Sequence, residues 1–197
     1  KGGVVVIQEI FGVNGHIRDV TDGFAQEGYL AVAPAIFDRF KRGVELDYTP
    51  ENIAVGREFK AQGNDNLNNV MADVEAARAA VSGAGKVGIT GYCWGGVVVW
   101  AAACRLSFDA AAGYYGGGII DLNDETPQCP TILHFGREDE SIPLADVNAI
   151  TAAHPNIPVH LYDAGHGFNC DRRGSYHAES AALARERTME LFKENLG

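Results

Sequence analysis

Short apolar runs rich in β-branched residues alternate along this chain with longer segments whose apolar residues recur at helical spacing. Strands that are buried on both faces are apolar almost throughout, and each parallel crossover needs a helix. The alternation therefore predicts an α/β fold, with a mostly parallel sheet and helices on both faces. The expected strands are Val4–Gln8, Leu30–Ala33, Lys86–Thr90, Ala110–Tyr114, Thr131–His134 and Val159–Tyr162.

Helices are expected in most of the intervals between these strands. The clearest are His16–Glu27, Leu67–Val81, Ala178–Asn195 and an apolar segment that begins near Val97. In the last helix we expect four residues to face the core: Leu183, Met189, Leu191 and Phe192. The segment 37–62 mixes charges, aromatic residues and a proline, and we interpret it as an excursion over the carboxyl edge of the sheet. No repeat or linker interrupts the pattern, so we predict one domain over residues 1–197.

Composition excludes several classes of protein. With 46% hydrophobic and 21% charged residues, the chain matches neither a disordered protein nor a membrane protein. A net charge of −10 disfavours binding to nucleic acid. The four cysteines form no Cys-x-x-Cys pair, which favours free thiols and a cytoplasmic location. We expect a small-molecule partner, no nucleic-acid or membrane partner, and a monomer in preference to an oligomer.

The most specific motif is Gly91-Tyr92-Cys93-Trp94-Gly95-Gly96, which follows an expected strand and precedes an expected helix. It matches the nucleophile elbow Gly-x-Ser-x-Gly with cysteine in place of serine. The tight turn needs glycine on both flanks, and the helix N-terminus beyond it favours a thiolate at Cys93. A buried cysteine in a glycine-bounded turn is the alternative interpretation.

An elbow of this kind requires an acid and then a histidine later in the chain, each after a strand. Asp139 follows the strand Thr131–His134, and His166 follows Val159–Tyr162 between two glycines. We expect His166 to act as the base toward Cys93, and Asp139 to fix its tautomer and stabilise the imidazolium. Glu138 and Glu140 compete with Asp139 for the acid role.

Four segments together resemble the dienelactone hydrolase family, also called carboxymethylenebutenolidases, within the α/β-hydrolase fold. They are Gln8–Asn14, Gly91–Gly96, Gly113–Gly116 and Ala164–Phe168. The resemblance runs over nearly the whole chain and implies that the first β-hairpin of the family is missing from this sequence. It also implies a hydrolase of activated esters or lactones that acts through a thioester acyl-enzyme. The substrate that the resemblance implies is dienelactone (4-carboxymethylenebut-2-en-4-olide), and the implied biological role is aromatic degradation.

The resemblance adds Glu9 to the catalytic residues, as the glutamate that takes part in switching the thiol to thiolate when substrate binds. It also implies an oxyanion hole made by the backbone N–H groups of Ile10 and Trp94. From the residues alone, a carboxylate at the end of an apolar run needs a partner, and a salt-bridged structural acid is an equal alternative. A negative neighbour would disfavour a resting thiolate at Cys93 and so protect it from oxidation.

Substrate recognition in the family uses two arginines that hold a carboxylate. Arg57 is a plausible counterpart of the first, but Cys170 stands four residues after His166, where the second is expected. A thiol cannot replace a guanidinium fork, so Arg172 or Arg173 would have to take its place.

The other expected substrate-binding residues are aromatic, namely Phe11 and Tyr115, and core packing is an equal alternative for Tyr115. His166, Cys170 and His160 lack further ligands at suitable spacing, so we predict no metal and no cofactor. Two alternatives to a dienelactone hydrolase remain. One is a related cysteine-dependent carboxylesterase or thioesterase with another substrate, and the other is a ligand-binding α/β domain without turnover.

Overall fold

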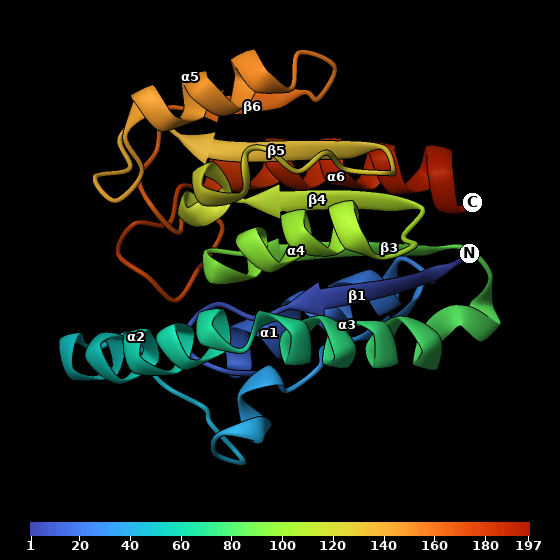
Figure 1. The fold of residues 1–197 in the computed structure, drawn as a ribbon, viewed down its shortest axis with the longest axis horizontal. Coiled ribbons are helices and arrows are strands. Elements are labelled where there is room, and N and C mark those ends of the chain that lie inside the picture. Colours follow the sequence, from blue (N-terminus) through green and yellow to red (C-terminus); the bar gives the residue numbers. More distant parts are fainter.

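The computed structural model describes all 197 residues and contains one six-stranded sheet in the order β2-β1-β3-β4-β5-β6 (Figure 1). All five strand pairings are parallel, as predicted. Each strand lies within two residues of its expected bounds. The strands are β1 (Gly3–Ile7), β2 (Leu30–Val32), β3 (Val87–Tyr92), β4 (Ala110–Tyr114), β5 (Thr131–Gly136) and β6 (Val159–Tyr162). This confirms the α/β class.

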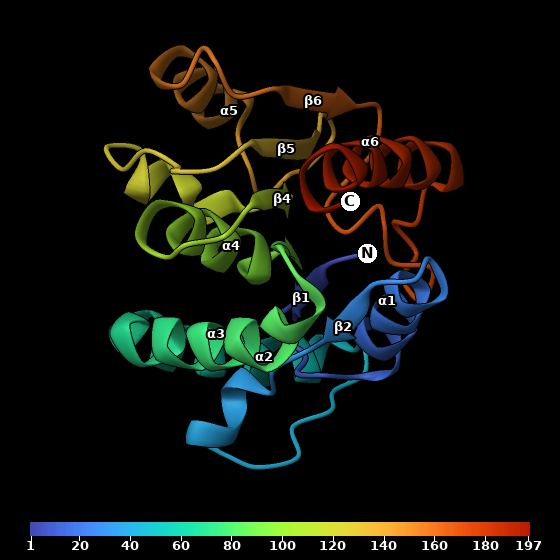
Figure 2. The ribbon, with the colours of Figure 1, turned by 90° about the vertical axis from the view of Figure 1, so that its right-hand side faces the viewer.

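Helices cover both faces of the sheet. They are α1 (Gly15–Gln26), α2 (Pro50–Asp65), α3 (Leu67–Val81), α4 (Trp94–Arg105), α5 (Leu144–Ala153) and α6 (Ala178–Leu196). Figure 2 shows α1 and α6 on one face, with α3, α4 and α5 on the other. Strands β1, β3, β4 and β5 are buried along their whole length, which explains why their sequences are mostly apolar.

The elbow helix begins at Trp94 and not near Val97, so the expected start is wrong by three residues. The error comes from treating Gly95 and Gly96 as part of the turn. Both lie inside the first turn of α4, where a Cβ on Gly95 would lie 2.4 Å from the carbonyl oxygen of Gln8. These glycines mark close contact between helix and strand ends rather than a loop.

The excursion over the carboxyl edge contains a regular helix that its sequence pattern did not indicate. Helix α2 begins directly after Thr49, whose Oγ1 accepts a hydrogen bond from the N–H of Asn52 at 3.2 Å, and Pro50 occupies its first turn. Its fully buried residues are Gly56 and Gly63, and its apolar side chains Ile53 and Phe59 are only partly buried against the core, so the apolar stripe is weak. Figure 1 shows α2 extending past the end of the sheet where the strands terminate.

The expected inward face of α6 is wrong at Leu183, which is 41% exposed. The residues of α6 that are buried follow helical spacing and include Ala181, Ala184, Thr188 and Phe192. Leu183 lies between the members of this stripe and so points away from the sheet.

None of the helices combines the length and apolarity needed to cross a lipid bilayer.

We expect Gly95→Ala to destabilise the fold by about 1–3 kcal/mol, because the new Cβ would overlap backbone oxygens that cannot move independently. Urea unfolding followed by circular dichroism measures the change. Gly83→Ala is the matched control, since nothing lies within 4 Å of its Cβ. Equal stabilities of the two variants would contradict this account of the elbow.

Candidate active site

Cys93 lies at the junction of β3 and α4 with φ 58° and ψ −119°, a conformation that residues other than glycine rarely adopt. Its N–H donates to the carbonyl of Tyr114 at 3.0 Å, and its carbonyl accepts from the N–H of Gly96 at 2.9 Å. These bonds hold the strained residue between β4 and the first turn of α4. The side chain is partly exposed and lines a cavity.

His166 and Asp139 meet beside the same cavity. The Nδ1–H of His166 donates to Oδ2 of Asp139 at 2.6 Å. The other oxygen, Oδ1, accepts from the N–H of Ser141 at 2.9 Å and from its hydroxyl at 2.6 Å. The Asp139 carboxylate is completely buried, whereas the His166 side chain is 22% exposed. Nδ1 is thus occupied, and Nε2 is left for a proton transfer partner.

The local environment shifts the pKa values of His166 and Asp139 in opposite directions. Burial lowers the pKa of His166, but hydrogen bonds to Asp139 and Cys93 and their charges outweigh it and raise the pKa to about 10. Burial alone would raise the pKa of Asp139, but hydrogen bonds from His166 and Ser141 shift it below its ordinary value. These interactions favour the protonated imidazole in this conformation.

The acid that contacts His166 is Asp139. Its neighbours Glu138 and Glu140, the other two candidates, line the cavity. The cavity has a volume of about 650 Å³ and lies at the carboxyl ends of the strands. Ser141 was not indicated by the sequence reasoning, although a serine two residues after an aspartate is a common partner in turns of this kind.

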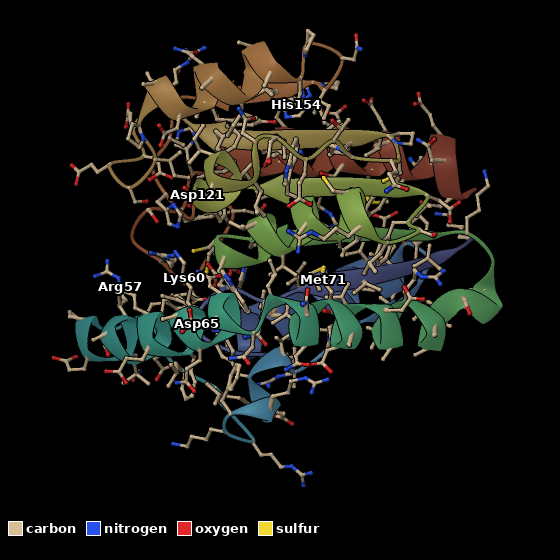
Figure 3. All side chains as sticks on the ribbon, viewed as in Figure 1. Arg57, Lys60, Asp65, Met71, Asp121 and His154 are labelled. Carbon is tan, nitrogen blue, oxygen red and sulfur yellow. The ribbon has the colours of Figure 1, made fainter.

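Three cationic side chains line the cavity. The sequence predicted Arg57 as the first substrate-binding cation and either Arg172 or Arg173 as the second. The structure brings Arg57, Lys60 and Arg173 to the cavity, whereas Arg172 hydrogen-bonds Asp19 elsewhere. Figure 3 shows Arg57 and Lys60 on the side of α2 that faces the end of the sheet where Asp121 lies. Lys60 was missed, though its spacing of three residues from Arg57 places both on one helix face.

The cavity also contains the two backbone groups expected to act as oxyanion donors. Ile10 and Trp94 both line it, and the N–H of Ile10 has no backbone acceptor. Trp94 is the first residue of α4, so its N–H has no acceptor within the helix. Phe11 and Tyr115 line the cavity as well, and both are almost completely buried. The ring of Tyr115 lies 5.2 Å from that of His166.

Glu9 lies beneath the cavity and is completely buried. Its Oε2 accepts a hydrogen bond from the hydroxyl of Tyr48 at 2.7 Å, and Oε1 lies 3.5 Å from Nη1 of Arg173. It makes no hydrogen bond with Cys93, so this conformation does not join the expected glutamate directly to the expected nucleophile. Tyr48, on the segment before α2, is a partner that the sequence did not reveal.

The sequence matches the model of the dienelactone hydrolase family over residues 1–196. The chain belongs to the dienelactone hydrolase family. It is a carboxylic-ester hydrolase with the α/β-hydrolase fold, as the sequence motifs predicted. The solved structures with this fold include one described as "Putative Dienelactone Hydrolase" from Klebsiella pneumoniae. That structure has a TM-score of 0.78 and 32% identity, covering 98% of this chain and 88% of the other.

Two relatives within the dienelactone hydrolase family illustrate the similarity. The chain is 41% identical over 213 residues to a Synechocystis sp. protein named "Putative carboxymethylenebutenolidase", with coverage of 98% of this chain and 86% of that protein. It is 34% identical over 199 residues to a carboxymethylenebutenolidase of Pseudomonas putida, with coverage of 96% and 84%. The family resemblance inferred from four short segments therefore extends over the whole sequence.

The raised pKa of His166 makes a prediction about pH. The interaction with Asp139 should stabilise the folded state fully below the ordinary imidazole pKa of about 6.5, and this contribution should fall as the pH rises through about 10. Nuclear magnetic resonance of the imidazole should give a midpoint near 10 in the wild type and a lower one in Asp139→Asn. Asp163→Asn, which alters an exposed aspartate, is the control. A wild-type midpoint near 6.5 would contradict the assignment.

Proposed function

We propose that the chain hydrolyses activated esters or lactones through a triad of Cys93, His166 and Asp139 and a thioester acyl-enzyme. The observation that carries the proposal is the 2.6 Å hydrogen bond between His166 and Asp139 beside the cavity that Cys93 lines. An imidazole oriented by a buried carboxylate next to an elbow thiol is the arrangement that activates a nucleophile and then protonates a leaving group.

The first half-reaction forms the acyl-enzyme. The positive charge of His166 favours the thiolate of Cys93, which attacks the carbonyl carbon of the substrate. The carbonyl oxygen gains the negative charge, and the N–H groups of Ile10 and Trp94 stabilise it. When the intermediate collapses, the bond to the leaving oxygen breaks and His166 donates its proton to that oxygen. The products are a thioester at Cys93 and a neutral imidazole.

The second half-reaction regenerates the enzyme. Neutral His166 accepts a proton from water while the water oxygen attacks the thioester carbonyl. Collapse of this second intermediate expels the Cys93 thiolate and releases the acid, which restores the original charges. Asp139 keeps Nδ1 of His166 occupied throughout, so Nε2 carries both proton transfers.

The cysteine nucleophile limits the range of substrates. A thiolate is itself a good leaving group, so an intermediate formed from a plain alkyl ester reverts to substrate. Lactones that release a stabilised enolate do not have this difficulty. Dienelactone, a product of chlorocatechol ring cleavage in aromatic degradation, is such a lactone, and its carboxylate matches the cations of Arg57, Lys60 and Arg173.

We assign Glu9 a role in controlling the charge of Cys93. In the present conformation Tyr48 and Arg173 bind the Glu9 carboxylate, which leaves the thiol to interact with His166. If a substrate carboxylate attracts Arg173 into the cavity, Glu9 loses a partner and the charge balance beneath Cys93 changes. Glu9→Gln should therefore alter the rate at which iodoacetamide alkylates Cys93.

A second candidate function is hydrolysis of an uncharged ester or thioester by the same triad. The observation that favours it is the presence of Asp121, Glu138 and Glu140 in the cavity, because these carboxylates repel an anionic substrate. Comparing an anionic lactone with a neutral activated ester distinguishes the two functions without changing the chemistry of the nucleophile.

Hydrolysis of cis- and trans-dienelactone, followed by loss of ultraviolet absorbance, tests the proposal. We expect Cys93→Ala to abolish turnover and Asp139→Asn to lower kcat by roughly 10²- to 10⁴-fold, because the imidazole loses its orientation and its tautomer. Cys129→Ser is the control, as a partly buried thiol away from the cavity. Wild-type turnover in Cys93→Ala would refute the mechanism.

Substrate charge gives a further prediction. Arg57→Gln and Lys60→Gln should each raise KM for dienelactone by about 10- to 100-fold, because each removes a charged hydrogen-bond donor. KM for a neutral ester such as p-nitrophenyl acetate should change little. Arg42→Gln, on the exposed surface, should affect neither substrate. Equal effects on both substrates would show that these cations do not recognise a carboxylate.

A further inference from the structure

Three potential metal ligands gather beneath the active-site cavity. Glu9 follows β1, His16 lies in the first turn of α1, and Cys170 belongs to the segment between β6 and α6. Each offers one ligand atom, and these atoms lie within 4.8 Å of one another. The three residues are 0%, 3% and 0% exposed, respectively. Buried groups of these types are rarely brought together unless they serve one another or a shared partner.

Two of the atoms in this cluster have no hydrogen-bond partner. They are Oε1 of Glu9 and Nε2 of His16, and both are completely buried. The hydroxyl of Tyr115 is a third buried atom without a hydrogen-bond partner. The pKa of Tyr115 is raised first by burial and then by the negative charge of Glu9, which shows that this hydroxyl lies close to the Glu9 carboxylate. Buried polar atoms in native proteins are nearly always bonded, so several buried atoms without a hydrogen-bond partner in one cluster indicate a missing ligand.

We propose that Glu9, His16 and Cys170 form a binding site for a divalent cation of the zinc type. A carboxylate, an imidazole and a thiolate are the three side-chain donors that Zn²⁺ accepts, whereas Mg²⁺ and Ca²⁺ prefer oxygen donors alone. Tetrahedral zinc bonds place ligand atoms about 3.3–3.7 Å apart. The cluster therefore has to contract by about 1 Å, which side-chain rotation can provide.

The surrounding residues already orient the ligands as metal sites require. Nδ1 of His16 lies 3.5 Å from Oδ1 of Asp171, and its Nε2 has no hydrogen-bond partner, so Nε2 is the ring nitrogen that is left for a metal. The hydroxyl of Tyr48 donates to Oε2 of Glu9, whereas Oε1 accepts no hydrogen bond and has only the ion pair with Arg173. Asn14 caps the first turn of α1 by accepting a hydrogen bond from the N–H of Ile17, which fixes the helix turn that carries His16.

Arg173 is the group that a cation would have to displace. Its Nη1 lies 3.5 Å from Oε1 of Glu9 but does not hydrogen-bond that oxygen. The guanidinium also lies over the rings of Phe11 and Tyr48 and lines the active-site cavity, so it has open space to enter. On binding, the thiol proton of Cys170 passes to solvent and a metal–sulfur bond forms. The charges of Glu9 and the thiolate then balance the cation.

The test uses Co²⁺ as a spectroscopic probe and the Cys93→Ser variant as the host. Replacing Cys93 removes the other thiol that faces a histidine, so metal binding and the proposed hydrolysis are measured separately. We expect one Co²⁺ per chain with a sulfur-to-cobalt charge-transfer band, and displacement of Co²⁺ by Zn²⁺. The band should vanish when Cys170→Ser is added to the host, and His16→Gln should weaken binding at least 10-fold.

If Cys170→Ser fails to fold, one further test variant and two control variants still allow the proposal to be refuted. Asp171→Asn should weaken Co²⁺ binding by about 10-fold or more, because it removes the carboxylate charge beside Nδ1 of His16 without removing a ligand. Asp163→Asn and Cys129→Ser, each added to the same host, should bind as the host does. Absence of a thiolate band in the folded host would overturn the proposal and leave water as the occupant. Binding that survives both His16→Gln and Asp171→Asn would also overturn it.

Discussion

The active site depends on the close approach of backbone segments where β3 turns into α4. A Cβ on Gly91 would lie 2.4 Å from the carbonyl oxygen of Gly95, and one on Gly96 would lie 2.6 Å from that of Tyr114. Only glycine allows the helix to start so near the ends of β1, β3 and β4. The strained backbone of Cys93 and the first N–H of α4 follow from this packing, so the same turn positions the proposed nucleophile and one of the two proposed oxyanion donors.

The parallel sheet brings the remaining groups to the same place. Because every strand runs in one direction, the segments after β1, β3, β5 and β6 all emerge at one edge. Those segments carry Ile10, Cys93, Asp139 and His166, which are far apart in the sequence. The sheet supplies a rigid frame, and each loop needs to fix only one functional group.

The sequence was sufficient for the strands and the order of the motifs, because burial on both faces leaves an unmistakable apolar pattern. Helix α2 was not predictable in this way, since the residues it buries are Gly56 and Gly63, which produce no hydrophobic periodicity. The choice between Arg172 and Arg173 depends on the path of an irregular segment that no periodicity describes. The proximity of His16 and Cys170, 154 residues apart, likewise depends on tertiary structure alone.

Helix α2 has an unusual relation to the rest of the molecule. Gly56 packs against the carbonyl of Ile10, and Gly63 packs against the ring of Trp94, whose Nε1 also donates to Asn64 at 2.8 Å. Ile53 and Phe59 of α2 pack against the core from positions that are only partly buried, whereas Arg57 and Lys60 belong to neither hydrophobic cluster. Mutations at these positions can accumulate without weakening the sheet or moving the nucleophile. Helix α2 can therefore change the charge of the cavity wall without a change in the strand-to-helix turn that carries Cys93.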